Sequence, residues 1–183
     1  MIKQFIRFLG VTDKEESTPS SQPPTQEAAT DSVRQIIARL DQLAPEQSHY
    51  IALFSSILSR VAHSDLNMSE VERMAIEEVV MKIGHLDQAT AVLVTEIAKY
   101  QNELLGGVEN YLITRAFKGL ATEAQKFELM ESLFAVAAAE AGISAEENQE
   151  VLKIAEEIGL TRQDFLAVRS RFKEHLNLLK DLP

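Results

Sequence analysis

The sequence predicts an all-α protein built from about eight helices in one compact domain. Apolar residues recur every three or four positions through most of the chain, which is the spacing of helices with one buried face. No stretch alternates apolar and polar residues for long enough to indicate a strand. Capping residues and glycines interrupt the apolar pattern at short intervals, so the loops are expected to be short.

Most of the expected helices begin after a residue that can cap them, and several end at a glycine. The expected caps are Asp31, Ser69, Asp87, Thr122, Ser144 and Thr161, and Pro45 suits the first turn of a further helix. The expected stops are Gly84, Gly106, Gly119 and Gly159. The eight helices are expected over residues 32–43, 46–63, 70–83, 88–105, 108–118, 123–141, 145–158 and 162–180.

The chain divides into three parts by composition. Residues 12–29 hold three prolines and many Ser, Thr and Gln, and they lack the apolar content to offset their ordering entropy, so we expect a flexible, disordered linker. Residues 30–183 form the helical domain. Residues 1–11 carry apolar side chains at helical spacing together with Lys3 and Arg7, and they predict a short amphipathic helix.

Three roles are open for this N-terminal helix. Its apolar face can dock on the chain's own domain, or it can dock in a groove of a partner protein. Residues 1–10 can also make a weak contact with an anionic membrane surface, since two basic side chains supply only about 2 kcal/mol of attraction.

The helical domain repeats a helix–corner–helix unit with an offset of 75 residues, and a pseudo-twofold axis is expected to relate the two copies. Apolar residues match throughout the two units, as amphipathic helices often do. The polar matches are more specific. They pair Asp65 with Glu140, Ser69 with Ser144, Glu72 with Glu147 and Gly84 with Gly159.

The four corner carboxylates, Asp65, Glu72, Glu140 and Glu147, allow two interpretations. Ser69 with Glu72, and Ser144 with Glu147, fit the capping box, which explains both glutamates without a ligand. Asp65 and Glu140 instead fall at the ends of their helices, where the helix dipole disfavours a negative charge. Four carboxylates brought together would suit Ca²⁺ or Mg²⁺, and less well Mn²⁺. The first corner is not an EF-hand, because Glu70 and Ile76 occupy positions that need Gly and Glu.

Composition and motifs exclude several other classes of function. The chain has no Cys and no Trp, and its net charge of −10 disfavours nucleic acid as a partner. The nucleotide-binding, zinc-protease and serine-hydrolase motifs are absent, so no catalytic residue is assigned and a non-enzymatic role is expected. The four histidines are scattered and are expected to be structural or exposed. The carboxylates of Glu77, Glu78, Glu156 and Glu157 are expected to face solvent.

Residues 58–76, LSRVAHSDLNMSEVERMAI, and 133–165 resemble the two halves of the TerB family of tellurite-resistance proteins. The family corner reads roughly A-D-G-x-[IVM]-[ST]-x-x-E. Two departures are visible: Leu66 replaces the corner glycine in the first unit, and Glu140 replaces Asp in the second, with Gly142 one residue late.

The resemblance extends over about residues 46–175 and implies a TerB-like helical domain with a metal site at the four corner acids. It further implies non-enzymatic work in the bacterial stress response, in the cytoplasm or at the periphery of the inner membrane, with a protein partner. The alternative is a peripheral membrane adaptor tethered by its N-terminal helix. A metal-dependent hydrolase is disfavoured because no nucleophile or base is visible.

Overall fold

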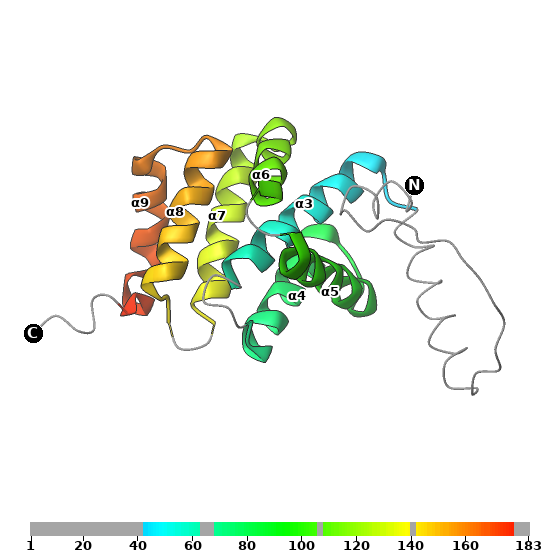
Figure 1. The fold of residues 1–183 in the computed structure, drawn as a ribbon, viewed down its shortest axis with the longest axis horizontal. Coiled ribbons are helices and arrows are strands. Elements are labelled where there is room, and N and C mark those ends of the chain that lie inside the picture. Colours follow the sequence, from blue (N-terminus) through cyan, green and yellow to red (C-terminus); the bar gives the residue numbers. More distant parts are fainter. Residues whose placement is uncertain (1–41, 63–67, 106–107, 140–141, 178–183) are drawn as a thin grey trace, which may run out of the picture.

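The computed structural model describes residues 42–62, 68–105, 108–139 and 142–177, and helices account for most of them (Figure 1). The helices are α3 (Pro45–Ala62), α4 (Glu70–Gly84), α5 (Gln88–Leu105), α6 (Val108–Leu120), α7 (Glu123–Ala137), α8 (Ala145–Ile158), α9 (Arg162–Arg169) and the 3₁₀ helix η1 (Ser170–His175). The all-α prediction is confirmed. No strand forms within these ranges, where the one β-type contact is an isolated bridge between Ile143 and Leu176.

Helix α3 is the centre of the fold. Every residue from Tyr50 to Ala62 is buried, so the helix has no solvent face along this stretch. A helix that is buried all round must be covered by its neighbours, and α3 contacts α4, α5, α6, α7 and α8. Figure 1 shows it crossing between α4 and α5 on one side and α7 and α8 on the other.

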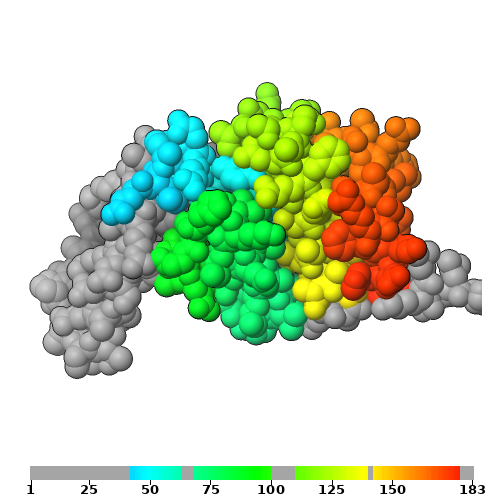
Figure 2. All heavy atoms as spheres, turned by 180° about the vertical axis from the view of Figure 1, so that it is seen from behind, coloured from blue at the N-terminus to red at the C-terminus, as the bar shows by residue number. Residues whose placement is uncertain are grey.

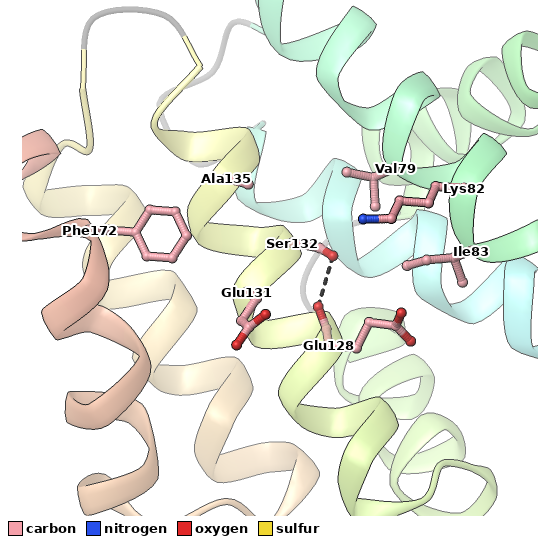
Figure 3. Close-up of a pocket in the computed structure, with 8 residues that line it drawn as sticks. All are labelled: Val79, Lys82, Ile83, Glu128, Glu131, Ser132, Ala135 and Phe172. Atoms are coloured by element: carbon pink, nitrogen blue, oxygen red, sulfur yellow. Dashed lines mark hydrogen bonds between the residues drawn. The ribbon is translucent and has the colours of Figure 1, made fainter.

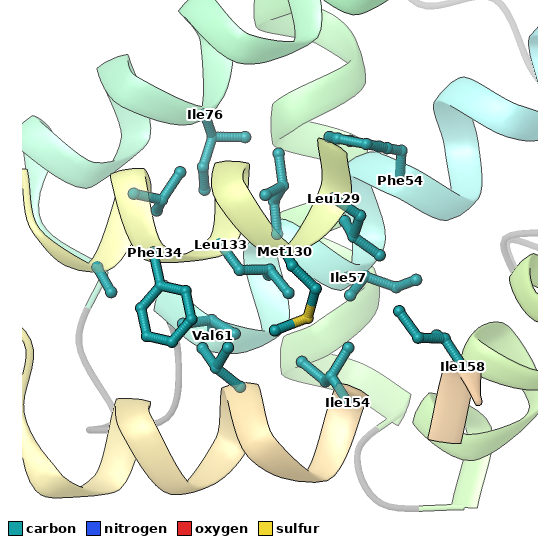
Figure 4. Packing of buried hydrophobic residues seen from close by; sticks show 14 of the residues in the cluster. Phe54, Ile57, Val61, Ile76, Leu129, Met130, Leu133, Phe134, Ile154 and Ile158 are labelled. Atoms are coloured by element: carbon teal, nitrogen blue, oxygen red, sulfur yellow. The ribbon is translucent and has the colours of Figure 1, made fainter. Parts of the chain in front are cut away.

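The hydrophobic core lies where the two repeated units meet (Figure 4). Phe54, Ile57 and Val61 of α3 are at most 1% exposed. They pack with fully buried side chains from α4, α7 and α8. These partners are Ile76, Leu129, Met130, Leu133, Phe134, Ile154 and Ile158. Fully burying a side chain of this kind stabilises the fold by about 1.5–3 kcal/mol, so the repeated apolar stripes are what hold the units together.

The C-terminal end differs from its prediction. One helix was expected over residues 162–180, but α9 ends at Arg169 and η1 carries the chain to His175. The change of direction lets Phe172 stack on Phe134 at 5.4 Å between ring centroids and lets Leu176 pair with Ile143. Figure 2 shows this red segment lying against the yellow end of α7.

Three other expectations meet different outcomes. The structure does not describe residues 1–11, the linker 12–29 or nearly all of the expected helix 32–43. The division of the chain into three parts therefore stays a prediction. The stop at Gly159 is confirmed, since this residue is the left-handed cap of α8. The stop at Gly84 is wrong by one residue, because His85 takes the left-handed conformation (φ 51°) and Gly84 is buried within α4. A side chain at Gly84 would meet Leu86 Cγ at 2.8 Å.

Within the described residues, no helix combines the length and the apolar character needed to cross a membrane.

Candidate functional site

The two corners end in the same capping box. Ser69 Oγ accepts from Glu72 N at 3.2 Å, and Glu72 Oε2 accepts from Ser69 N at 2.8 Å. At the second corner, Ser144 Oγ accepts from Glu147 N at 3.1 Å, and Glu147 Oε2 accepts from Ser144 N at 2.8 Å. The serines share an extended backbone as well, with φ and ψ of −72° and 162° against −71° and 170°. The capping boxes predicted at the two corners are therefore confirmed at the level of individual hydrogen bonds.

Glu72 and Glu147 are also equally buried, each at 5% exposure. A carboxylate is seldom removed from water unless charged or hydrogen-bonding partners replace the water. The cap N–H groups and the positive end of each helix provide part of that replacement. The corners thus hold two carboxylate oxygen donors in equivalent, largely dry positions.

The other two predicted metal ligands, Asp65 and Glu140, lie outside the described residues, as does His63. Among the residues that are described, no group of three or more His, Asp or Glu side chains could hold a metal ion. The chemistry of the donor set still fits Mg²⁺ or Ca²⁺, because these ions prefer carboxylate oxygens. Any cation at Glu72 or Glu147 has to share the carboxylate with the cap, since Oε2 already accepts a backbone N–H.

The second corner is held in place by the C-terminal segment. Ile143 N donates to His175 O at 2.7 Å, and Asn177 N donates to Ile143 O at 3.1 Å. Gly142 has a φ of +95°, and a Cβ there would sit 2.6 Å from His175 O. The glycine that comes late in the second corner is therefore required by both its backbone conformation and this close approach.

A buried charge cluster joins α3 to α6 and α8. Arg60 is 6% exposed and pairs with two carboxylates of α8, Glu150 and Glu157. Arg60 Nη1 donates to Glu157 Oε2 at 2.8 Å, and Thr114 Oγ1 of α6 donates to the same oxygen at 2.8 Å. Burial disfavours the charge on Glu157, but the hydrogen bonds from Arg60 and Thr114 outweigh it and hold the pKa of this carboxyl below its usual value.

A second ionic group lies on α4. Arg73 pairs with Glu70 and Glu77, and Glu77 is only 7% exposed. Burial raises the pKa of Glu77; the nearby Arg73 opposes this shift, and the like charges of Glu70 and Glu96 add to it.

The prediction that four glutamates face solvent is thus wrong for Glu77 and Glu157 and confirmed for Glu78 and Glu156, which are exposed. Sequence reasoning missed the Arg60 cluster because the partners of Glu157 are distant in the chain. Arg73 and its two partners are neighbours on one helix, but the burial of Glu77 depends on the packing of α4 against other helices. A signal was present in Arg60, an isolated charge within the otherwise apolar and small residues 50–62.

Two depressions open on the surface near α4. One has a volume of about 320 Å³ and lies between α4, α7 and η1 (Figure 3). Its polar groups include Lys82, Glu128 and Glu131, and Ser132 Oγ donates within α7 to Glu128 O at 2.8 Å. The other has a volume of about 560 Å³ and is lined mainly by α4.

Comparison with known proteins gives one result that bears on this geometry. The family model described as tellurite resistance protein TerB matches residues 49–170, which include both corners and most of the described helices. No curated protein and no solved structure gave a significant match.

Proposed function

This chain belongs to the TerB family of tellurite-resistance proteins, and from that premise we propose that it is a non-enzymatic binding or scaffold module of the bacterial stress response. We propose further that it acts in the cytoplasm and binds a divalent cation through Asp65, Glu72, Glu140 and Glu147. The cation would be Ca²⁺ or Mg²⁺, with Mn²⁺ less favoured, because all four donors are carboxylates.

The duplicated corner supports this proposal most directly. Glu72 and Glu147 are both 5% exposed and both sit at a helix N-terminus, so the fold places two carboxylates in matching positions. Asp65 and Glu140 each precede one of these glutamates by seven residues. Carboxylates that gather at one point repel each other, and a bound cation would remove that repulsion.

The chain's own residues would do three things in such a site. The acids supply the oxygen ligands. The capping hydrogen bonds at Ser69 and Ser144 orient the glutamates. The buried stripes of α3, α4, α7 and α8 fix the two corners relative to the core. Binding would then couple to folding, since a ligand that binds the native state stabilises it.

Thermal unfolding with and without each cation tests the proposal. A cation present at about 100 times its Kd should stabilise the protein by about 2.7 kcal/mol, which raises Tm by roughly 5–10 °C for a chain of this size. The Asp65→Asn/Glu140→Gln variant should lose the shift. The absence of a shift with Ca²⁺, Mg²⁺ and Mn²⁺, or a shift that the variant retains, would remove the cation from the proposal.

A second candidate function is a peripheral membrane adaptor. The composition of residues 1–10 favours it, because an apolar stripe and two basic side chains suit an anionic bilayer surface. Sedimentation with anionic liposomes tests this role in the full chain. The adaptor role requires the Lys3→Gln/Arg7→Gln variant to pellet less than the unmodified protein, and equal pelleting would end it.

A further inference from the structure

The face of α4 that points away from the core carries an apolar groove. Val71 is 46% exposed and Met74 is 59% exposed, and both line the depression of about 560 Å³ together with Met81. The core side of the same helix is formed by Ile76 and Val80, which are at most 2% exposed. Figure 2 shows α4 open to solvent between α5 and the end of α7. An exposed apolar strip on a helix of a charged protein is typical of a binding surface.

The groove is also acidic. Glu77 and Glu78 line it, and the charges of Glu70 and Glu96 lie close enough to affect Glu77. Arg73 offsets part of this negative charge by pairing with Glu70 and Glu77. An amphipathic helix with basic side chains beside its apolar face is therefore the complementary occupant.

The described chain begins close to this helix. Gln47 Nε2 of the first turn of α3 donates to Gly84 O at the end of α4, at 3.2 Å. More than thirty residues separate Val11 from Pro45. Residues 12–29 are expected to be a flexible linker and residues 32–43 a helix. A flexible chain of about eighteen residues has a typical end-to-end distance of about 23 Å and a twelve-residue helix spans about 18 Å, so together they exceed the length of α4, about 22 Å. The N-terminal residues can therefore reach any part of the groove.

Residues 1–11 have the chemistry that the groove requires. Ile2, Phe5, Ile6 and Leu9 form one apolar stripe at helical spacing. Lys3 and Arg7 are the charged side chains of this segment, and it contains no acid. As a helix the segment would be about 16 Å long, close to the distance of about 15 Å from Val71 to Met81 along α4.

We propose that residues 1–11 dock as an amphipathic helix in the α4 groove of the same chain. The apolar stripe covers Val71, Met74 and Met81, and Lys3 and Arg7 lie beside Glu77 and Glu78. The occupant is thus a segment of this chain, rather than a second copy of it or a membrane.

Methyl resonances of methionine test the docking in the full-length protein. The chain has five methionines; Met74 and Met81 line the groove, whereas Met130 is fully buried in the core and serves as an internal control. The Phe5→Ser/Ile6→Ser variant should shift the methyl signals of Met74 and Met81 and leave that of Met130 unchanged. Phe8→Ser, which lies off the stripe, is the matched control and should shift none of them.

A spin label gives an independent measure of proximity. The chain has no cysteine, so a nitroxide on Thr12→Cys labels a single position. It should broaden the Met74 and Met81 signals more strongly than the Met130 signal, and Phe5→Ser/Ile6→Ser should abolish the difference.

Three outcomes would overturn the proposal. The methyl chemical shifts of Met74 and Met81 could remain unchanged in the Phe5→Ser/Ile6→Ser variant. Their shifts could instead depend on protein concentration, which would identify a second copy as the occupant. They could also stay unaffected until anionic vesicles recruit residues 1–11, which would identify the membrane as the binding surface for this segment.

Discussion

Glu72 and Glu147 stand 75 residues apart in the chain, yet each accepts the backbone N–H of its own cap serine at 2.8 Å and each is 5% exposed. Helices α7 and α9 also begin with capping boxes, but those boxes are exposed, so the burial of Glu72 and Glu147 is what sets the boxes of α4 and α8 apart. The pair defines the repeat on which the proposed function depends. It also makes the energetic contributions of the two corners directly comparable.

The two cap serines should contribute equally to stability. Replacing Ser69 or Ser144 with Ala removes a hydrogen bond to the first turn of α4 or α8. Each change should lower the free energy of unfolding by about 1 kcal/mol, and the double variant should lose about the sum of the two. Urea unfolding checks this. Ser170→Ala, at an exposed position within the C-terminal helices, is the control and should change little. A loss at one corner only would contradict the equivalence.

The Arg60 cluster should be a major contributor to stability. Arg60→Ala leaves the carboxylates of Glu150 and Glu157 without their cation in a largely buried place, and such a loss costs roughly 3–5 kcal/mol. The control is Arg171→Ala, which breaks an exposed pair with Glu131 and should cost less than about 1 kcal/mol. Chemical denaturation measures both. Similar losses for the two variants would mean that burial of the cluster has no energetic consequence.

Stability should fall in acid partly through Glu157. Burial opposes the charge on Glu157, but the hydrogen bonds from Arg60 and Thr114 hold its pKa in the folded state below the usual value. The ionised carboxylate therefore adds to the free energy of unfolding at pH values above its pKa in the unfolded chain. This added stability is lost as the pH falls through the pKa of the folded state. Unfolding free energies measured between about pH 6 and 3 should decline less steeply for Glu157→Gln than for the unmodified protein.

Glu77 should act in the opposite direction. Burial raises its folded pKa, so the folded state takes up a proton more readily and gains stability as pH falls. Glu77→Gln should therefore make the acid decline steeper. Slopes that change in the same direction for the two variants would contradict these assignments.

Two glycines of similar position should respond oppositely to alanine. A Cβ at Gly84 would meet Leu86 Cγ at 2.8 Å and Ile51 Cδ1 at 3.0 Å, whereas nothing lies within 4 Å of a Cβ at Gly119. Gly84→Ala should cost about 1–3 kcal/mol through overpacking. Gly119→Ala should stabilise α6 by up to about 1 kcal/mol, since Ala is the better helix former. The melting temperatures of the two variants test both predictions. A higher melting temperature for Gly84→Ala would show that Leu86 and Ile51 can make room for a side chain at position 84.

The helices could be predicted from the sequence where local signals are strong. The Ser-x-x-Glu boxes mark the starts of α4 and α8 because the cap depends on residues three positions apart. Long-range contacts are different. The early end of α9 follows from the contact of Phe172 with Phe134 and the pairing of Leu176 with Ile143, which no local pattern encodes.

The same limit explains what the sequence did and did not predict about the candidate site. The caps at Glu72 and Glu147 follow from spacing alone, whereas the burial of Glu157 depends on Arg60, 97 residues earlier in the chain. The metal-ligand assignment at Asp65 and Glu140 stays a prediction, because both residues lie outside the part of the chain that the structure describes.

The most direct test of the cation proposal is calorimetric titration of the full chain with Ca²⁺ and with Mg²⁺. The same titrations of the Glu72→Gln/Glu147→Gln variant give the comparison. Gln can complete a capping box, as Gln125 does with Thr122 in α7, so this variant should keep both caps while it loses two charged ligands. We predict a binding isotherm for the unmodified protein and a loss of at least tenfold in affinity for the variant, with its unfolding in the absence of cations nearly unchanged. Equal affinities, or no heat of binding in either protein, would contradict the proposal that the repeated corners bind a cation.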